Sequence, residues 1–205
     1  MSASETRAGI VAAADELFYR QGYAHTSFAD IATAVDLSRG NFYYHFRSKD
    51  EILAAVIATR LKRTEMMLAD WEKAAVDPLV RIRCFIDIVI RNRAEIKRFG
   101  CPVGSLTTEL AKLGQQGGGE ARRIFDLFRC WLARQFAALG LAASAADAAA
   151  LHLLAWSQGV AVLANVFHDE AFIRREVREI EARLQSMLPP GRRTGRRARR
   201  NPGRP

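Results

Sequence analysis

Apolar residues recur every three or four positions along almost the whole chain, and this spacing constrains the fold more than any other feature. One example is the series Ile173, Val177, Ile180 and Leu184, which places apolar side chains on one face of a helix. No stretch shows the alternation of apolar and polar residues that a half-buried strand requires, and no Asn-Gly hairpin signal occurs. With 205 residues, 49% of them hydrophobic, the chain is long enough to bury a core. The sequence therefore predicts an all-α protein with nine helices.

Local signals mark where several of these helices begin and end. Ser, Asp and Pro at the start of a helix satisfy or avoid the backbone N–H groups that have no partner within it. Gly22 is placed to end the first helix, and one unbroken helix is expected over residues 78–98. The predicted starts are Ser27-x-x-Asp30, Ser48-x-x-Glu51, Asp77-Pro78, Ser144-x-x-Asp147 and Asp169.

The net charge of +9 does not by itself indicate a DNA-binding surface. Residues 189–205 contain seven arginines and no acidic residue, so subtracting seven from +9 leaves +2 for residues 1–188. The arginine-rich tail is expected to be disordered. A role for it in non-specific DNA binding and a simple role as a solvated tail both remain open.

The composition and the first residues of the chain also restrict the cellular compartment in which the protein is expected to act. No run of about 18 uninterrupted apolar residues is present, which argues against a membrane span and a membrane partner. The first residues lack the pattern of a signal peptide. Three scattered cysteines, Cys84, Cys101 and Cys130, fit reduced thiols better than a disulfide framework. We expect a cytoplasmic protein.

The stretch LSRGNFYYHF, residues 37–46, is predicted to be a short DNA-reading helix. A helix of about seven residues is unstable alone, so Phe42 and Phe46, four positions apart, must anchor it against the preceding helix. The outward positions are then Arg39, Gly40, Asn41, Tyr43 and Tyr44. Arginine can pair with guanine and asparagine with adenine in the major groove. From these residues alone, a structural aromatic turn without a DNA role remains an equal alternative.

Fixed spacings over about 45 residues of this region resemble the N-terminal domain of TetR-family regulators. The matching positions are Gly22-Tyr23-x-x-Thr26-Ser27-Phe28-x-Asp30-Ile31-Ala32 and Leu37-Ser38-x-Gly40-x-Phe42-Tyr43-x-His45-Phe46-x-Ser48-Lys49-x-x-x-Leu53. The resemblance implies base contacts by Arg39, Asn41 and Tyr43. Its full implied DNA-binding set is Thr26, Ser27, Ser38, Arg39, Gly40, Asn41, Tyr43, Tyr44, His45 and Lys49. Asp36 departs from the glycine usual in the turn, and its negative charge is expected to weaken DNA binding slightly.

The resemblance further implies a bacterial protein associated with the nucleoid and a TetR-like division of the chain. Residues 1–47 would form a three-helix helix-turn-helix DNA-binding domain, residues 48–188 a helical effector-binding and dimerisation domain, and residues 189–205 the disordered tail. Helices over about residues 147–188 would pair in a homodimer that binds a palindromic operator, with half-sites roughly 34–36 Å apart. Each apolar stripe on these helices could instead face its own core.

Residues expected to line an effector pocket lie on the helices between residues 78 and 167. Each of them could instead be an ordinary core residue. The candidates are Ile86, Ile90, Phe99, Cys101, Val103, Phe125, Phe128, Trp131, His152 and Trp156.

Cys101 lies in a Gly-Cys-x-x-Gly segment similar to one in a TetR subgroup that includes a repressor responsive to N-ethylmaleimide. A thiol near a helix N-terminus, close to Lys97 and Arg98, can have a lowered pKa and react with electrophiles. The alternative is a small apolar residue that fills a helix junction.

Other function classes lack sequence support. The four histidines are far apart, and we find no zinc motif, phosphate-binding loop or nucleophile elbow, so we predict no enzyme activity, cofactor or metal site. A cationic RNA- or membrane-surface protein driven by the tail would bind without sequence preference. We therefore predict a dimeric one-component repressor of transcription. A small hydrophobic or electrophilic effector would release it from DNA, or alternatively Cys101 would act as a thiol-based electrophile or redox sensor.

Overall fold

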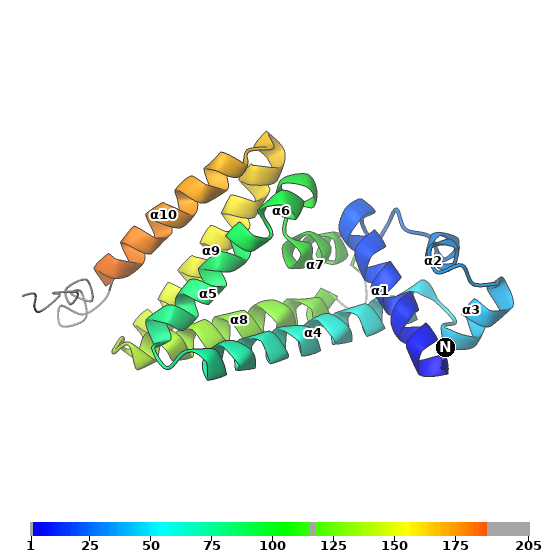
Figure 1. The fold of residues 1–205 in the computed structure, drawn as a ribbon, viewed down its shortest axis with the longest axis horizontal. Helices are drawn as coiled ribbons and strands as arrows, with labels where there is room; N and C mark the ends of the chain where they lie inside the picture. The colour runs from blue at the N-terminus through cyan, green and yellow to red at the C-terminus, as the bar shows by residue number, and fades with distance from the viewer. Residues whose placement is uncertain (1, 115–117, 188–205) are drawn as a thin grey trace, which may run out of the picture.

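The computed structural model describes residues 2–114 and 118–187, and this part of the chain is entirely helical in its regular structure (Figure 1). The all-α prediction is confirmed. The described residues form ten helices rather than nine: α1 (Ala3–Gln21), α2 (Phe28–Ala34), α3 (Arg39–His45), α4 (Lys49–Ala74), α5 (Pro78–Arg91), α6 (Arg93–Phe99), α7 (Pro102–Leu113), α8 (Gly118–Ala138), α9 (Ala143–Phe167) and α10 (Glu170–Met187). The predicted disordered tail lies outside the described residues.

The additional helix arises because the stretch predicted as one helix over residues 78–98 is broken at Asn92. The Asn92 side-chain amide donates to the carbonyl of Ile88 at 2.9 Å. Asn92 is both the C-cap residue of α5 and the N-cap residue of α6. Asparagine bonds readily to nearby backbone groups and so favours helix ends. No glycine or proline marks the break, which is why the apolar spacing predicted a continuous helix.

Two hydrophobic clusters form the interior. The smaller one joins α1, α2, α3 and the first half of α4, and it also takes Leu106 and Leu110 from α7 and Ala121 from α8. The larger one joins the second half of α4 with α5, α6, α8, α9 and α10. Helix α4, with 26 residues and thus about 39 Å long, connects the two. In Figure 1, α3 lies at one end of the molecule and α10 runs towards the other.

Most predicted helix starts are confirmed, and one is wrong. Asp77 accepts from the Leu79 N–H, and Asp169 accepts from the N–H groups of Ala171 and Phe172. Ser144 does not cap α9, which begins after Ala142 without a side-chain cap. Asp147, the proposed partner of Ser144, instead forms a two-pronged ion pair with Arg129 of α8, at 2.8 and 2.6 Å.

Helix α9 is long and apolar enough to cross a membrane by length and composition, and it alone is so among the residues described here. Core helices of soluble proteins pass the same test. In this fold α9 packs closely against α8 and also contacts α6 and α10, and the Asp147–Arg129 ion pair ties it to α8. Burial in the larger cluster therefore explains part of its apolar character, while several large apolar side chains of α9 remain exposed.

Candidate nucleic-acid interface

Helices α2 and α3 form a helix-turn-helix that is fixed from behind by aromatic side chains. Phe42 and Phe46 are fully buried, as predicted, and Ile31 of α2 is equally buried. The rings of Phe28 and Phe42 meet edge to face at 4.6 Å. The guanidinium of Arg7 on α1 lies 4.3 Å from the centre of the Phe46 ring. These contacts orient α3, which is too short to be stable alone.

The opposite side of α3 faces solvent. Gly40 and Asn41 are exposed, and the side chains of Tyr43 and Tyr44 are 55% and 78% exposed. The Tyr43 ring leans on Phe28 at 5.0 Å, so its direction is fixed by a neighbour. Arg39 occupies the first position of α3. The side chains of Asn41, Tyr43 and Tyr44 therefore form an exposed polar and phenolic face where the sequence predicted one.

Gly40 is open on its outer side. A Cβ atom built at this position meets nothing within 4 Å. Its φ angle is not among the positive values found at other glycines, so the helix itself does not require glycine here. Packing within the chain thus gives no reason for the missing side chain, whereas close approach of another molecule does.

The predicted cap residues lie at the starts of α2, α3 and α4. Ser27 and Asp30 form a complete capping box, which lowers the pKa of the Asp30 carboxyl through hydrogen bonds from the Ser27 backbone and hydroxyl. Ser38 accepts from the Asn41 N–H at 3.4 Å. At α4 the box is modified, because Glu51 accepts from the Arg47 N–H and not from the N–H of the cap residue, Ser48.

Two further residues of the implied DNA-binding set form hydrogen bonds within the protein. Thr26 is fully buried, and its hydroxyl donates to the Gly22 carbonyl at 2.7 Å. Lys49 donates to the Tyr23 carbonyl at 3.0 Å, and its ammonium lies 4.1 Å from the centre of the Tyr23 ring. Burial raises the pKa of the Tyr23 hydroxyl above its usual range, and a hydrogen bond to Asp50 raises it further. By contrast, Tyr44 and His45 stack edge to face at 5.1 Å at the exposed end of α3.

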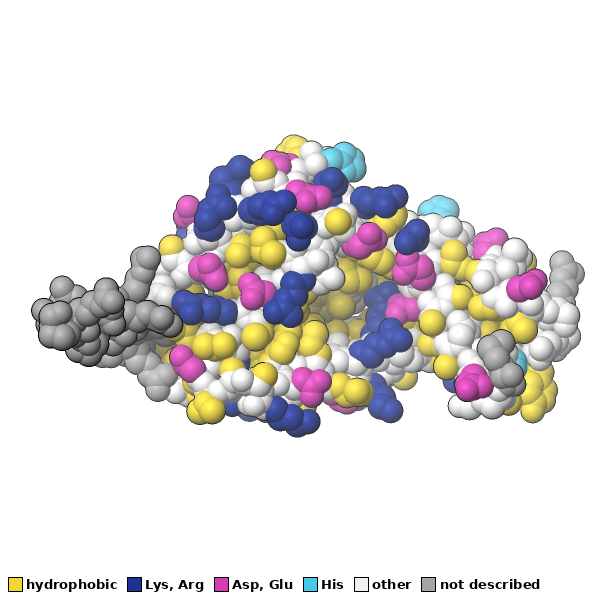
Figure 2. Space-filling model, viewed as in Figure 1, with side chains coloured by type: hydrophobic (Ala, Val, Ile, Leu, Met, Phe, Trp, Pro, Cys, Tyr) yellow, Lys and Arg dark blue, Asp and Glu magenta, His cyan; other side chains and the backbone are white. Residues whose placement is uncertain are grey.

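The charge distribution around this face is mixed. Asp36 has a φ of 51° in the turn before α3, the left-handed conformation that glycine adopts most easily and that aspartate tolerates. On the side of the molecule seen in Figure 2, Lys and Arg side chains are interspersed with Asp and Glu, and no continuous basic patch covers the described N-terminal side chains. DNA binding by this face would therefore depend on individual hydrogen-bond donors at defined positions and not on a continuous basic patch.

Comparisons with known proteins agree with this geometry. The sequence model described as "Bacterial regulatory proteins, tetR family" matches residues 10–56. The HTH-type transcriptional regulator in the lacX 3′ region of Lactococcus lactis subsp. lactis is 31% identical over 167 residues, which cover 80% of this chain and 85% of that protein. The chain belongs to the TetR family.

Two further proteins show the range of similarity. The HTH-type transcriptional repressor DhaR of Mycobacterium sp. (strain GP1) is 28% identical over 129 residues, covering 62% of this chain and 63% of DhaR. The fold is shared with a TetR transcriptional regulator from Legionella pneumophila, with a TM-score of 0.77 and 24% identity over 90% of this chain and 98% of that one. TetR-family regulators are soluble cytoplasmic proteins that bind DNA and act as dimers with small-molecule effectors. This TetR-family chain is accordingly a transcriptional regulator and not an enzyme.

A small apolar cavity of about 90 Å³ lies between α5, α6, α7, α8 and α9. Four of the ten predicted pocket residues line it: Cys101, Val103, Phe125 and Phe128. Apolar spacing did not reveal the other ten lining residues, which are Phe85, Ile88, Val89, Asn92, Ile96, Pro102, Leu154, Ser157, Gln158 and Ala161. No charged side chain is among the lining residues.

The remaining predicted pocket residues lie elsewhere. Ile86 is fully buried in the larger cluster, and Ile90 and Trp156 pack against its edge. The Trp131 ring meets Trp71 at 5.5 Å. Phe99 packs on Tyr19 of α1 at 5.6 Å, whereas His152 is exposed to solvent.

Cys101 is the cap residue at the start of α7, half-buried at the cavity wall. Its sulfur accepts a hydrogen bond from the Gly104 N–H at 3.4 Å. In the described residues, no group of three or more His, Cys, Asp or Glu side chains could hold a metal ion.

Proposed function

We propose that this TetR-family chain is a repressor that binds a palindromic operator as a homodimer and is released by a small, uncharged, largely apolar effector. In this proposal residues 1–47 read DNA, and residues 48–188 bind the effector and dimerise. The observation that carries it is the exposed face of α3, held by two fully buried phenylalanines. Arg39, Asn41 and Tyr43 would contact bases.

Ser27, Ser38, Tyr44 and His45 would contact phosphates through their side chains or the nearby backbone N–H groups. Lys49, at the start of α4, would contact a phosphate through its ammonium group. Thr26 would act indirectly by closing the loop before α2, because it is fully buried, its hydroxyl donates to the Gly22 carbonyl and its N–H donates to the Tyr23 carbonyl. The repression itself is supported by the similarity to a protein named as a repressor, DhaR.

The dimer surface is proposed to lie mainly on α9. Large apolar side chains of α9 are exposed in the single chain, and a face of this kind typically marks a protein interface. These residues are Leu151, Val162, Leu163, Val166 and Phe167. The stripe of α10 that the sequence also suggested for dimerisation instead packs into the chain's own core, because Ile173, Val177, Ile180 and Leu184 are all buried. Only the outer face of α10 remains available to a partner.

The cavity supports the choice of effector. Among the described lining residues, amide and hydroxyl groups come from Asn92, Ser157 and Gln158, and Ser157 already donates to the Leu154 carbonyl at 2.7 Å. A charged ligand would find no counter-ion there, and burying it would be costly. An apolar cavity of about 150 Å³ accommodates benzene. An effector larger than this must therefore move the helices that line this smaller cavity.

The decisive experiment selects duplexes from a random-sequence pool with the wild-type chain and then measures binding of variants by fluorescence anisotropy. The combined change Arg39→Ala, Asn41→Ala and Tyr43→Ala is expected to abolish both binding to the selected palindrome and its footprint. The circular dichroism spectrum, which reports the fold, should stay unchanged. A matched control replaces three exposed residues of α4, away from the proposed DNA and dimer surfaces: Lys62, Glu65 and Met66. Undiminished footprints with the first variant would refute the proposal.

A further inference from the structure

Glu109 belongs to α7, yet its carboxylate binds the loop between α1 and α2. One oxygen, Oε2, accepts from the Tyr23 N–H at 2.9 Å, and the other, Oε1, accepts from the Ala24 N–H at 2.7 Å. Both oxygens are thus used, on two consecutive backbone donors 85 or more residues away in sequence. Hydrogen bonds to a charged group are stronger than neutral ones. The contact fixes the backbone of the loop and does not depend on its side chains.

The loop is shaped to admit this carboxylate. Gly22 has a φ of 89°, and a Cβ atom built there would lie 3.2 Å from both Glu109 oxygens. A side chain at this position would be strained by the backbone conformation and would also crowd the carboxylate. The glycine that ends α1 therefore also provides the room for Glu109.

The held loop leads directly into the helix-turn-helix. The Tyr23 peptide is bound from both sides, because its N–H donates to Glu109 and its carbonyl accepts from Lys49 at the start of α4. Thr26 closes the loop by donating to the Gly22 carbonyl, and Ser27 then caps α2. We infer that Glu109 is a positioning residue for DNA binding. It sets the start of α2 and the Lys49 side chain relative to α3, an inference that rests on the proposed function.

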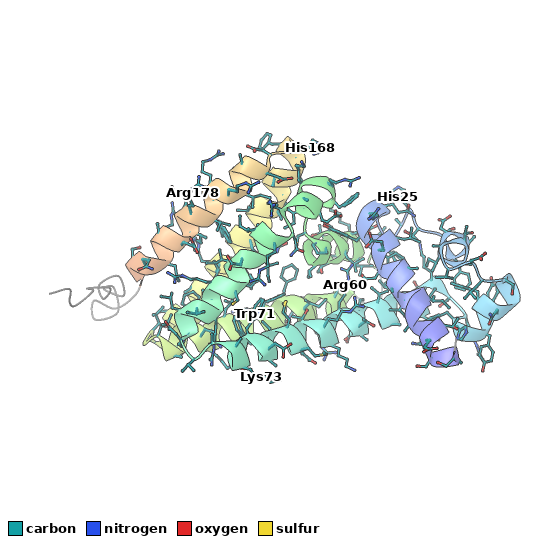
Figure 3. The ribbon with its side chains drawn as sticks, viewed as in Figure 1. His25, Arg60, Trp71, Lys73, His168 and Arg178 are labelled. Carbon is teal, nitrogen blue, oxygen red and sulfur yellow. The ribbon has the colours of Figure 1, made fainter. Side chains whose placement is uncertain are left out.

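The same helix reaches the effector cavity. Pro102 and Val103, at the first turn of α7, line the cavity, and Glu109 lies seven residues further, about 10 Å along the helix axis. This first turn is also tied to the N-terminal cluster. The Arg60 side chain, labelled in Figure 3 where α4 passes α1 and α7, donates to the Pro102 carbonyl at 2.5 Å and to Asp15 of α1 at 2.6 Å.

Displacement of α7 by a bound effector would therefore act on Glu109. Hydrogen bonds from N–H to oxygen weaken beyond about 3.2 Å, so a shift of about 1 Å would loosen both contacts. The loop before α2 would then lose its attachment, and operator affinity would fall without any change in the base-contacting side chains.

The test compares Glu109→Ala and Glu109→Gln with Thr108→Ala, a matched change at an exposed position of the same helix. Binding to the selected palindrome is measured by anisotropy, and amide hydrogen exchange of Tyr23 and Ala24 is measured by NMR. We expect Glu109→Ala, which removes both hydrogen bonds to the loop, to bind about 10-fold more weakly, a change of about 1.4 kcal/mol. Glu109→Gln keeps an acceptor and should show a smaller loss, and Thr108→Ala should match wild type. Exchange at the two amides should rise only in the Glu109 variants.

Three results would overturn the positioning role of Glu109. Unchanged exchange at Tyr23 and Ala24 would show that Glu109 does not hold the loop, and faster exchange with full operator affinity would show that the loop does not matter for binding. Faster exchange throughout both clusters would indicate a general loss of stability, which also overturns the positioning role. The triple alanine variant of α3 separates this inference from the proposed function. If that variant loses binding while Glu109→Ala retains it, only the inference fails, whereas binding by the triple variant refutes the proposed function itself.

Discussion

Replacing Gly40 by alanine should stabilise the free protein and weaken operator binding at the same time. Alanine favours the helical conformation over glycine by about 0.5–1 kcal/mol, and the added methyl group meets nothing within 4 Å in the free chain. For a chain of this size, such a gain raises the melting temperature by roughly 1–4 °C. A structural role for Gly40 within the chain would predict the opposite sign.

The loss of affinity follows from close packing against DNA. If the backbone of α3 touches the duplex at Gly40, the methyl group must be accommodated in a filled contact, which typically costs about 1–3 kcal/mol. This corresponds to roughly 5- to 150-fold weaker binding per half-site. Anisotropy with the selected palindrome measures the affinity, and differential scanning fluorimetry measures the melting temperature.

Gly9→Ala provides the matched control. Gly9 is an exposed glycine within α1, and a Cβ atom built there also meets nothing within 4 Å. We expect the same gain in melting temperature with operator affinity unchanged. If Gly40→Ala is as stable as the control and binds the operator as tightly as wild type, α3 does not approach DNA through this backbone, and the proposed orientation of the helix is wrong.

Four further outcomes are expected. Asp36→Asn keeps a residue that tolerates the left-handed turn but removes a negative charge, so operator binding should tighten by roughly 2- to 5-fold at low salt and less at high salt; equal gains at all salt concentrations would contradict this. Gly159 lies on the exposed side of α9, and a Cβ atom built there meets nothing within 4 Å, so the Gly159→Leu monomer should fold normally. Sedimentation should show a weakened dimer, whereas an intact dimer would place the interface elsewhere. Burial, followed by the negative charge of Glu95, raises the pKa of the Tyr19 hydroxyl to about 12. The neutral hydroxyl therefore stabilises the fold below pH ~10, and this contribution is lost between pH ~10 and ~12. Denaturant titrations should show that the difference in unfolding free energy between wild type and Tyr19→Phe shrinks over this pH range. Deleting residues 189–205 should leave the operator footprint unchanged, since α10 runs away from α3 in Figure 1, but should flatten the salt dependence of non-specific DNA binding; an unchanged salt slope would leave the tail without a DNA role.

Local chemistry explains which parts of the fold were predictable. The pair Phe42 and Phe46, the cap at Asp77 and the glycine end at Gly22 each depend on residues within one helical turn, and the structure confirms all three. Asp147 was misassigned because its partner, Arg129, is 18 residues away, and the local Ser144 pattern gave no sign of that tertiary ion pair. Short-range patterns therefore placed the helix-turn-helix well and the start of α9 poorly.

The cavity was harder to predict because an apolar residue on a helix does not reveal which neighbour it will face. Phe125 and Phe128 line the cavity, whereas Trp131, one turn further along α8, packs on Trp71. Gln158 gave no apolar signal, yet its Oε1 lies so close to Gly104 that a Cβ atom there would be only 2.1 Å away. The crossing of α7 and α9 thus determines the wall of the cavity, and it is set by tertiary packing between residues more than 50 positions apart.

Helix α7 also argues against treating the two predicted domains as independent units. Its first turn lines the cavity, while Leu106 and Leu110 are buried in the same cluster as Phe42 and Phe46. A ligand shifts a conformational equilibrium only by the difference between its affinities for the two states. If the proposed effector is larger than the cavity and displaces α7, that displacement reaches the N-terminal cluster directly, because Leu106 and Leu110 belong to it. A coupling free energy of about 1–3 kcal/mol, the usual range for such systems, would reduce operator affinity by roughly 5- to 150-fold.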